Sequence, residues 1–174
     1  MLPLNQFFDL CMGRWTIERT YHYLPEQRSE RSHTNYYITP LSDTARAQVL
    51  QDNQQTTPTG YTGGFHLDFD TISETGEKTA MSLNILFVPT QADPIEGVYL
   101  RDRAYEEQRP IAAHFRYDPD RSEMLMTTPY TQVVSVDSIT FVNPDLRLRR
   151  ILNYRRAPVL TEPLLIGFGI EQRV

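Results

Sequence analysis

The start of the chain changes from a helical to a strand pattern of hydrophobic positions. Apolar side chains first recur at intervals of three and four residues, which is typical of one face of a helix: Leu4, Phe7, Phe8 and Cys11. Gly13 stands where a helix commonly adopts its left-handed C-terminal cap. From Trp15 the period becomes two, so Trp15 and Arg19 share one face. We therefore predict a helix over Leu4–Met12 and a strand over Trp15–Tyr23.

The rest of the chain consists of short alternating segments separated by turns. In the clearest segment, Phe65, Leu67 and Phe69 alternate with His66, Asp68 and Asp70. Further strands are predicted at residues 29–40, 63–71, 79–88, 95–101, 109–117, 124–128, 131–141, 146–154 and 164–171. One more helix is predicted over Leu41–Asn53, capped by Ser42 or Asp43.

About nine or ten strands joined by short turns indicate an antiparallel sheet. A sheet of this length usually closes into a barrel, because closure removes its exposed edges. We predict an all-β, up-and-down barrel of about eight to ten strands that holds one small ligand, with the N-terminal helix across one end and one further short helix. The whole chain, residues 1–174, is expected to form this single domain.

Composition narrows the classes of function. The formal net charge of -5 argues against a nucleic-acid-binding role. One cysteine excludes an internal disulfide and fits a reducing compartment, and no signal peptide or membrane-spanning apolar run is found, so we expect a cytoplasmic protein without membrane contact. Lys78 is the only lysine. This bias towards arginine fits anion recognition, but it is equally a possible consequence of genome composition.

Three motifs together resemble one known family. They are FFDLCMGRWTIERTYHY at residues 7–23, RAYEEQRPIAAHFRYDPD at 103–120 and FVNPDLRLR at 141–149, and the segments at 63–70 and 171–173 fit in register. In this combination the chain resembles the S-type phycobiliprotein lyases, the CpcS/CpeS family. The resemblance implies a lipocalin- or calycin-like barrel, in agreement with the Gly13-x-Trp15 opening of the first strand. It also implies a pairing of Trp15 with Arg173, which gives Trp15 a structural role.

The resemblance implies that the protein binds a linear tetrapyrrole and promotes its thioether attachment to a cysteine of a phycobiliprotein α or β subunit. The ligand would be a phycobilin, either phycocyanobilin or phycoerythrobilin. Such a molecule carries two propionates, a row of pyrrole nitrogens and an ethylidene group that a thiol can attack. The protein must therefore supply cations for the propionates and a carboxyl group near the nitrogens. The nucleophile belongs to the partner, and Cys11 is expected to be a packed thiol.

Arginines are the first candidates for the propionates. Arg19 shares a face with Trp15 and would lie about 13 Å further along the strand, at the depth of a ligand pocket. Arg147 and Arg149 share one face of their strand, with leucines on the other. If the leucines face the core, both arginines face water; if the arginines line the cavity, they can pair with propionates.

The remaining candidates follow from the resemblance. His22 corresponds to a functional histidine, although strand parity places it opposite Arg19, so a position at the rim would suit it. Asp137 corresponds to a carboxylate that can protonate the pyrrole nitrogens, and Glu171 is a second candidate of this kind. Phe69 stands where many relatives have a tryptophan, and we expect it to contribute to bilin binding.

No metal site is predicted, because the four histidines lack the spacing of ligands. The oligomer is left open as a homodimer or as a heterodimer with a paired lyase. Two alternatives to a lyase also remain open: a lipocalin-like carrier of a fatty acid or tetrapyrrole without transferase chemistry, and a non-catalytic subunit of a heteromeric lyase.

Overall fold

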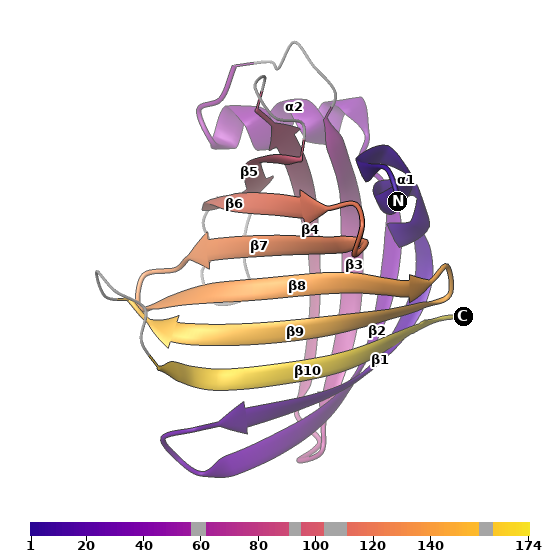
Figure 1. Cartoon of the computed structure of the whole chain (residues 1–174). Coiled ribbons are helices and arrows are strands. Elements are labelled where there is room, and N and C mark those ends of the chain that lie inside the picture. Colours follow the sequence, from indigo (N-terminus) through magenta and orange to yellow (C-terminus); the bar gives the residue numbers. More distant parts are fainter. Residues whose placement is uncertain (57–61, 91–94, 103–110, 157–161) are drawn as a thin grey trace.

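The computed structural model describes residues 1–56, 62–90, 95–102, 111–156 and 162–174, and it confirms the predicted antiparallel barrel with two helices (Figure 1). The elements are α1 Leu4–Cys11, β1 Gly13–Tyr23, β2 Arg28–Pro40, α2 Asp43–Asp52, β3 Gly63–Ser73, β4 Lys78–Pro89, β5 Glu96–Arg101, β6 Ile111–Asp118, β7 Glu123–Pro129, β8 Val133–Asn143, β9 Leu146–Arg155 and β10 Pro163–Arg173. Residues 103–110, which carry part of the second motif and the start of the strand predicted at 109–117, lie outside the described residues.

The topology is strictly up-and-down. Each strand pairs with its neighbours in sequence, and β1 pairs with β10 to close the barrel. The closing register sets Trp15 opposite Arg173 and Arg19 opposite Gly169. Both ends of the chain therefore lie near the same end of the barrel, beside α1 (Figure 1).

Helix α1 closes that end of the barrel. Its buried residues are Phe7, Phe8 and Cys11. Phe7 packs against the rings of Tyr117 and Phe141 at centroid distances of 5.1 and 5.2 Å, and Phe8 packs against Phe87 at 4.9 Å. The apolar face of this short helix thus supplies the floor of the barrel.

Trp15 joins the floor to the first strand. Gly13 turns the chain into β1 with φ of 107°, a conformation that L side chains rarely adopt. The Trp15 indole is fully buried and its Nε1 donates to the Cys11 carbonyl at 3.0 Å. The Arg173 guanidinium carbon lies 4.5 Å from the ring centroid, which confirms the predicted pairing, and that of Arg147 lies 4.1 Å away.

Helix α2 packs on the outside of the barrel. As predicted, Ser42 caps it, because its Oγ accepts a hydrogen bond from the Ala45 amide at 3.1 Å. Val49 and Leu50 are buried in a second, smaller apolar cluster with Leu41, Leu86 and Leu100. In the described part of the chain, neither helix has the length and apolar character needed to cross a membrane.

Candidate functional site

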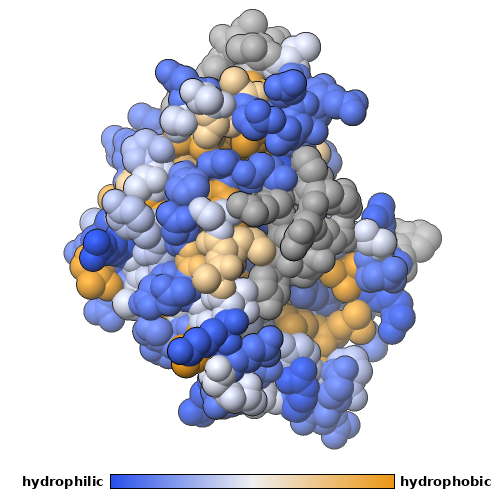
Figure 2. All heavy atoms as spheres, turned by 180° about the vertical axis from the view of Figure 1, so that it is seen from behind, coloured by the Kyte–Doolittle hydropathy of each residue, from blue (hydrophilic) through white to orange (hydrophobic). Residues whose placement is uncertain are grey.

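The barrel encloses a cavity of about 420 Å³, within the usual range for small-molecule sites. Figure 2 shows, at the lower right of this face, a hollow in which hydrophobic side chains lie between hydrophilic ones. Strands β3, β4 and β7 contribute mainly apolar lining: Phe65, Leu67, Phe69, Leu83, Ile85, Phe87, Met124 and Met126. Phe69 is among these lining residues, and its ring lies edge-on to Tyr36 at 5.8 Å. Its contact with a bilin stays a prediction.

Strands β9 and β10 carry their polar side chains inward. Arg147 and Arg149 line the cavity, while Leu148 between them is 45% exposed on the outer face. On β10, Phe168 and Ile170 are likewise exposed, at 54% and 58%. Of the two orientations that the sequence left open for the LRLR segment, the structure thus adopts the one with both arginines inside.

The inward-facing arginines of β9 and β1 lie on either side of β10, and residues paired across these three strands form rows around the barrel. In one row, Arg149 of β9 and Arg19 of β1 flank Gly169 of β10. A Cβ atom at Gly169 would lie 3.5 Å from the Arg149 Cβ and 3.8 Å from the Arg19 Nε. A methyl group would make only ordinary contacts there, so glycine leaves this side of the two cationic side chains open to the cavity, from which a carboxylate could approach them.

Glu171 lies one row nearer the floor, and it does not line the cavity. It is fully buried, its carboxylate accepts a hydrogen bond from the Nε of Arg147, and its Oε1 accepts one from the Nε of Arg149 at 2.5 Å. Burial alone would raise the pKa of Glu171, but the two arginines lower it from 4.5 to about 2. The expected direct contact between Glu171 and a ligand is thus corrected. Its carboxylate instead orients Arg147 and Arg149 from a buried position outside the cavity lining.

Arg19 is held by two tyrosines that the sequence reasoning missed. Its Nη1 donates to Tyr21 Oη at 2.9 Å, and its Nη2 donates to Tyr36 Oη at 3.0 Å. Tyr21 shares the inward face of β1 with Arg19, and this parity was the available signal. The Nε of Arg19 is buried and has no hydrogen-bond partner among the described residues, and the same holds for Nη1 of Arg147.

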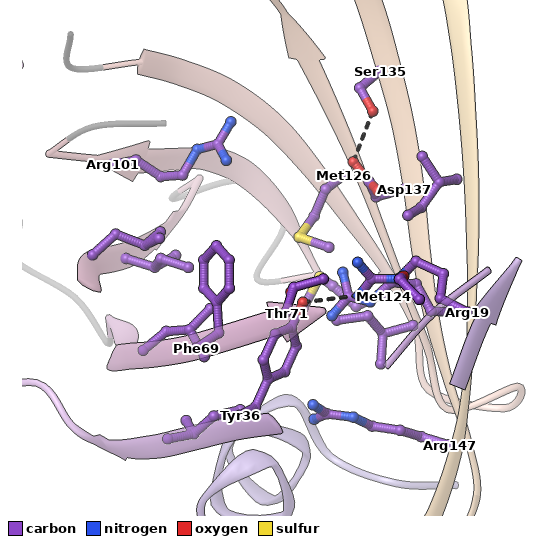
Figure 3. A pocket seen from close by; sticks show the side chains of 18 of the residues that line it. Arg19, Tyr36, Phe69, Thr71, Arg101, Met124, Met126, Ser135, Asp137 and Arg147 are labelled. Atoms are coloured by element: carbon purple, nitrogen blue, oxygen red, sulfur yellow. Dashed lines mark hydrogen bonds between the residues drawn. The ribbon is translucent and has the colours of Figure 1, made fainter. Parts of the chain in front are cut away.

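Asp137 lines the cavity from β8. Its Oδ2 accepts a hydrogen bond from Ser135 Oγ at 3.0 Å (Figure 3). Burial raises the pKa of the Asp137 carboxyl above its ordinary value, although Arg149 acts against this rise. A carboxyl group with a raised pKa can hold a proton in the cavity and donate it to a ligand.

His22 is not brought together with these residues. The pairing of β1 with both neighbours runs without a register shift, so His22 stays on the opposite face from Arg19, where it is exposed. It does not line the cavity. The outward orientation near the end of β1 agrees with the parity and the rim position expected for His22, and its role there stays a prediction.

Arg101 is a further cation that the sequence reasoning did not single out. It lines the cavity from β5, which lies halfway round the barrel from β10. Figure 3 shows its guanidinium pointing into the cavity from the side opposite Arg19. Its Nη2 donates to Tyr130 Oη at 2.6 Å. Alternation with Tyr99 on the strand predicted at 95–101 would have placed it on the inner face.

The thiol of Cys11 is buried, and burial raises its pKa to about 11. A thiol of this kind is mostly protonated near neutral pH and is a poor nucleophile, in agreement with the packing role expected for it. Among the residues that the structure describes, no group of three or more His, Cys, Asp or Glu side chains could hold a metal ion.

Comparisons with known proteins agree with this architecture. The family model described as CpeS-like protein matches residues 3–174. The chain is 51% identical to chromophore lyase CpcS/CpeS 1 of Synechococcus sp. (strain JA-3-3Ab), covering 98% of this chain and 96% of the relative. It is 26% identical to the phycocyanobilin lyase subunit CpcS of a Picosynechococcus species, covering 83% and 75%. The fold matches the S-type phycobiliprotein lyase CpeS of Guillardia theta with a TM-score of 0.81 and 17% identity, over 99% and 93% of the two chains.

Proposed function

The chain belongs to the CpeS-like family, and on this premise we propose that it is a bilin lyase. It binds a phycobilin non-covalently in the barrel and promotes thioether attachment of this bilin to a cysteine of an apo-phycobiliprotein α or β subunit. The name of one relative, a phycocyanobilin lyase subunit, favours phycocyanobilin as the bilin. The cyanobacterial relatives favour the cytoplasm as the place of the reaction.

The observation that carries this proposal is the excess of positive charge in a largely apolar cavity. Around Arg19, Arg147 and Arg149 there are one fully ionised carboxylate, Glu171, and one carboxyl group whose pKa is raised, Asp137, and Arg101 adds a fourth cation from the opposite wall. Among the described residues, the other lining carboxylates are the exposed Glu77, and Glu30, which pairs with Arg28. Buried cations without enough anions are costly, so such a cavity favours an anionic ligand. A bilin has the matching parts, since its conjugated rings suit the apolar wall and its propionates suit the guanidinium groups of Arg19 and Arg149.

In the proposed reaction the protein positions the bilin and moves protons. Asp137 hydrogen-bonds the pyrrole nitrogens and keeps the conjugated system protonated, which makes the ethylidene carbon more electrophilic. The thiol sulfur of the partner forms a bond to this exocyclic carbon, and the thiol proton ends on the ring carbon of the same double bond, so no group leaves. Loss of the non-covalent contacts then releases the loaded subunit.

The test is co-expression of this protein with a phycocyanobilin-producing pathway and an apo-phycobiliprotein subunit. A covalent adduct that survives denaturation and depends on this protein supports a lyase. Tight bilin binding without any adduct would instead favour the carrier or the non-catalytic subunit of a heteromeric lyase, the latter if addition of a second lyase restores the adduct. Absence of bilin binding by the purified protein would contradict the whole proposal.

The propionate contact is tested with Arg149→Ala, and Arg150→Ala serves as the matched control because Arg150 faces outward and is 49% exposed. Loss of a charge-assisted hydrogen bond should weaken binding of the free acid by about ten- to a hundred-fold. The bilin dimethyl ester should bind wild type about as poorly as the free acid binds Arg149→Ala. If Arg149→Ala still prefers the acid as strongly as wild type does, the propionates are bound elsewhere.

A further inference from the structure

Asn153 is a polar residue of the cavity wall that the reaction described above does not use. It lies on the inner face of β9, four residues beyond Arg149. The register places it beside Leu165 of β10, which in turn pairs with Tyr23 at the end of β1. Because β1 starts at the floor formed by α1, this row lies at the opposite, open end of the barrel.

One polar atom of the half-buried Asn153 lacks the hydrogen bond that a buried acceptor needs. Its Oδ1 is buried and has no hydrogen-bond partner among the described residues. Ser135 is its neighbour across the β8–β9 ladder, but the Ser135 hydroxyl donates to Asp137. The inward neighbours Ile151 on β9 and Leu165 on β10 have no polar side-chain atoms, and Arg155, the next residue on this face of β9, is exposed at the end of the strand. A buried acceptor of this kind is uncommon in native proteins and requires an explanation, such as a ligand.

The carboxamide of asparagine offers an acceptor oxygen next to an NH₂ donor. A lactam has the complementary pair, an N–H beside a carbonyl, so that two parallel hydrogen bonds can form between them. The terminal rings of a phycobilin are lactams. On the basis of the proposed function, we infer that Asn153 binds the lactam of the terminal ring that carries the ethylidene group.

The position of Asn153 agrees with this assignment. Four residues of strand separate it from Arg149 by about 13 Å. That distance suits a bilin whose propionates contact Arg149 and Arg19 and whose chain of rings extends towards the mouth. The ring held by Asn153 is then the ring nearest the solvent, where a thiol of a partner protein can reach its ethylidene carbon. Asn153 is thus a positioning residue that selects which end of the bilin faces outward.

The test compares phycocyanobilin with its O-methyl lactim ether at the ethylidene-bearing ring, which lacks both the N–H and the carbonyl. Wild type should bind the lactam about tenfold more tightly than the ether, because the ether has no N–H for the asparagine oxygen and leaves that buried acceptor unpaired. Asn153→Leu should bind both with nearly equal affinity. Tyr154→Leu, on the outer face of the same strand, should behave as wild type. Affinities are measured by bilin absorbance titration, and circular dichroism checks the fold of each variant.

The outcomes separate this inference from the proposed function. If wild type binds phycocyanobilin and the ether with equal affinity, Asn153 does not hydrogen-bond the lactam, and the lyase proposal stands. This comparison needs no variant, so it holds even if Asn153→Leu fails to fold. An Asn153→Leu protein that folds and retains the full preference of wild type also overturns the inference. The inference is also overturned if wild type discriminates against the lactim ether of the other terminal ring but not against that of the ethylidene-bearing ring. Failure of wild type to bind either compound overturns the proposed function itself.

Discussion

The hairpin β3–β4 and the pair β9–β10 line the same cavity with opposite chemistry. In β3 the inward side chains include Phe65 and Leu67, and acidic residues alternate with them outside. In β9 the inward side chains are Arg147 and Arg149, and Leu148 lies outside. The first arrangement buries apolar area and stabilises the barrel by about 25 cal/mol per Å². The second holds guanidinium groups in the interior and exposes apolar side chains to water.

The difference indicates that one set of strands mainly stabilises the fold and another mainly provides charged groups for binding. We call β3, β4 and β7 the apolar half and β1, β9 and β10 the charged half. We expect the apolar half to contribute more of the folding free energy, because the charged half loses part of that contribution by keeping cations in the cavity. The charged half is kept in place by Glu171, which contacts both Arg147 and Arg149. Substitutions in the two halves should therefore separate stability from binding.

The largest loss of stability is expected in the apolar half, for Phe87→Ala. The Phe87 ring packs against Phe8, Tyr99 and Phe115 at centroid distances of 4.9 to 5.3 Å. Its removal should lower the free energy of unfolding by about 3–5 kcal/mol, measured by urea denaturation. Ile72→Ala, at an exposed position of the same hairpin, should change it by less than about 0.5 kcal/mol. A small loss for Phe87→Ala would mean that the apolar half does not dominate folding.

Within the charged half, Glu171→Gln should be the most damaging substitution. It leaves Arg147 and Arg149 buried without their anion, so the free energy of unfolding should fall by about 3 kcal/mol. Glu123→Gln, which removes a partly exposed carboxylate 3.8 Å from Arg150, should cost less than about 1 kcal/mol. Equal losses in the two variants, compared by urea denaturation, would show that Glu171 has no special role.

Low pH should lower the free energy of unfolding by protonating the carboxylate of Glu171. Since the folded pKa of Glu171 is lowered to about 2 from 4.5, its ionised form stabilises the fold above pH 4.5. This stabilisation should disappear as the pH falls from about 4.5 to about 2. In Glu171→Gln this part of the acid destabilisation should be absent, so the difference in stability between the two proteins should shrink over that window. A difference that stays constant with pH, followed by denaturant titration, would contradict the assignment.

Asp137→Asn should have a smaller effect of the opposite sign. The pKa of Asp137 is raised by burial, so its ionised form destabilises the fold. That penalty is absent at low pH and develops as the pH rises through the ordinary pKa of 3.8 towards the higher folded pKa. Asp137→Asn should therefore be more stable than wild type at pH 7 and equal to it near pH 3, while attachment of the bilin is reduced. Thermal unfolding at the two pH values provides the comparison.

The smallest effect is expected on the outer face of β10. Phe168 is 54% exposed, so Phe168→Ser should change the free energy of unfolding by no more than about 0.5 kcal/mol. The same measurement on the buried Phe87→Ala gives the contrast. A loss above about 2 kcal/mol for Phe168→Ser would indicate that the outer apolar face is covered in solution.

Most of the fold could be predicted from the sequence, because local patterns decide it. Alternating positions and turn residues located the strands, and spacings of three and four located both helices within a few residues of their observed bounds. Closure of the barrel followed from the number of strands and the advantage of hiding their edges. The pairing of Trp15 with Arg173 came from the family resemblance, and the register of β1 with β10 confirms it.

The candidate site depended on tertiary structure to a much greater extent. Parity shows which residues share a face, but it does not show whether that face points inward. Hydrophobicity alone would have placed the leucines of β9 inside and its arginines outside, which is wrong. The orientation of Arg147 and Arg149 is decided by Glu171 on the next strand, and the side on which Arg149 and Arg19 are open to the cavity is decided by Gly169. These contacts join residues about 20 to 150 positions apart in the chain. No local pattern encodes them, because the free energy of a buried charge is determined by the neighbours that closure of the barrel brings to it.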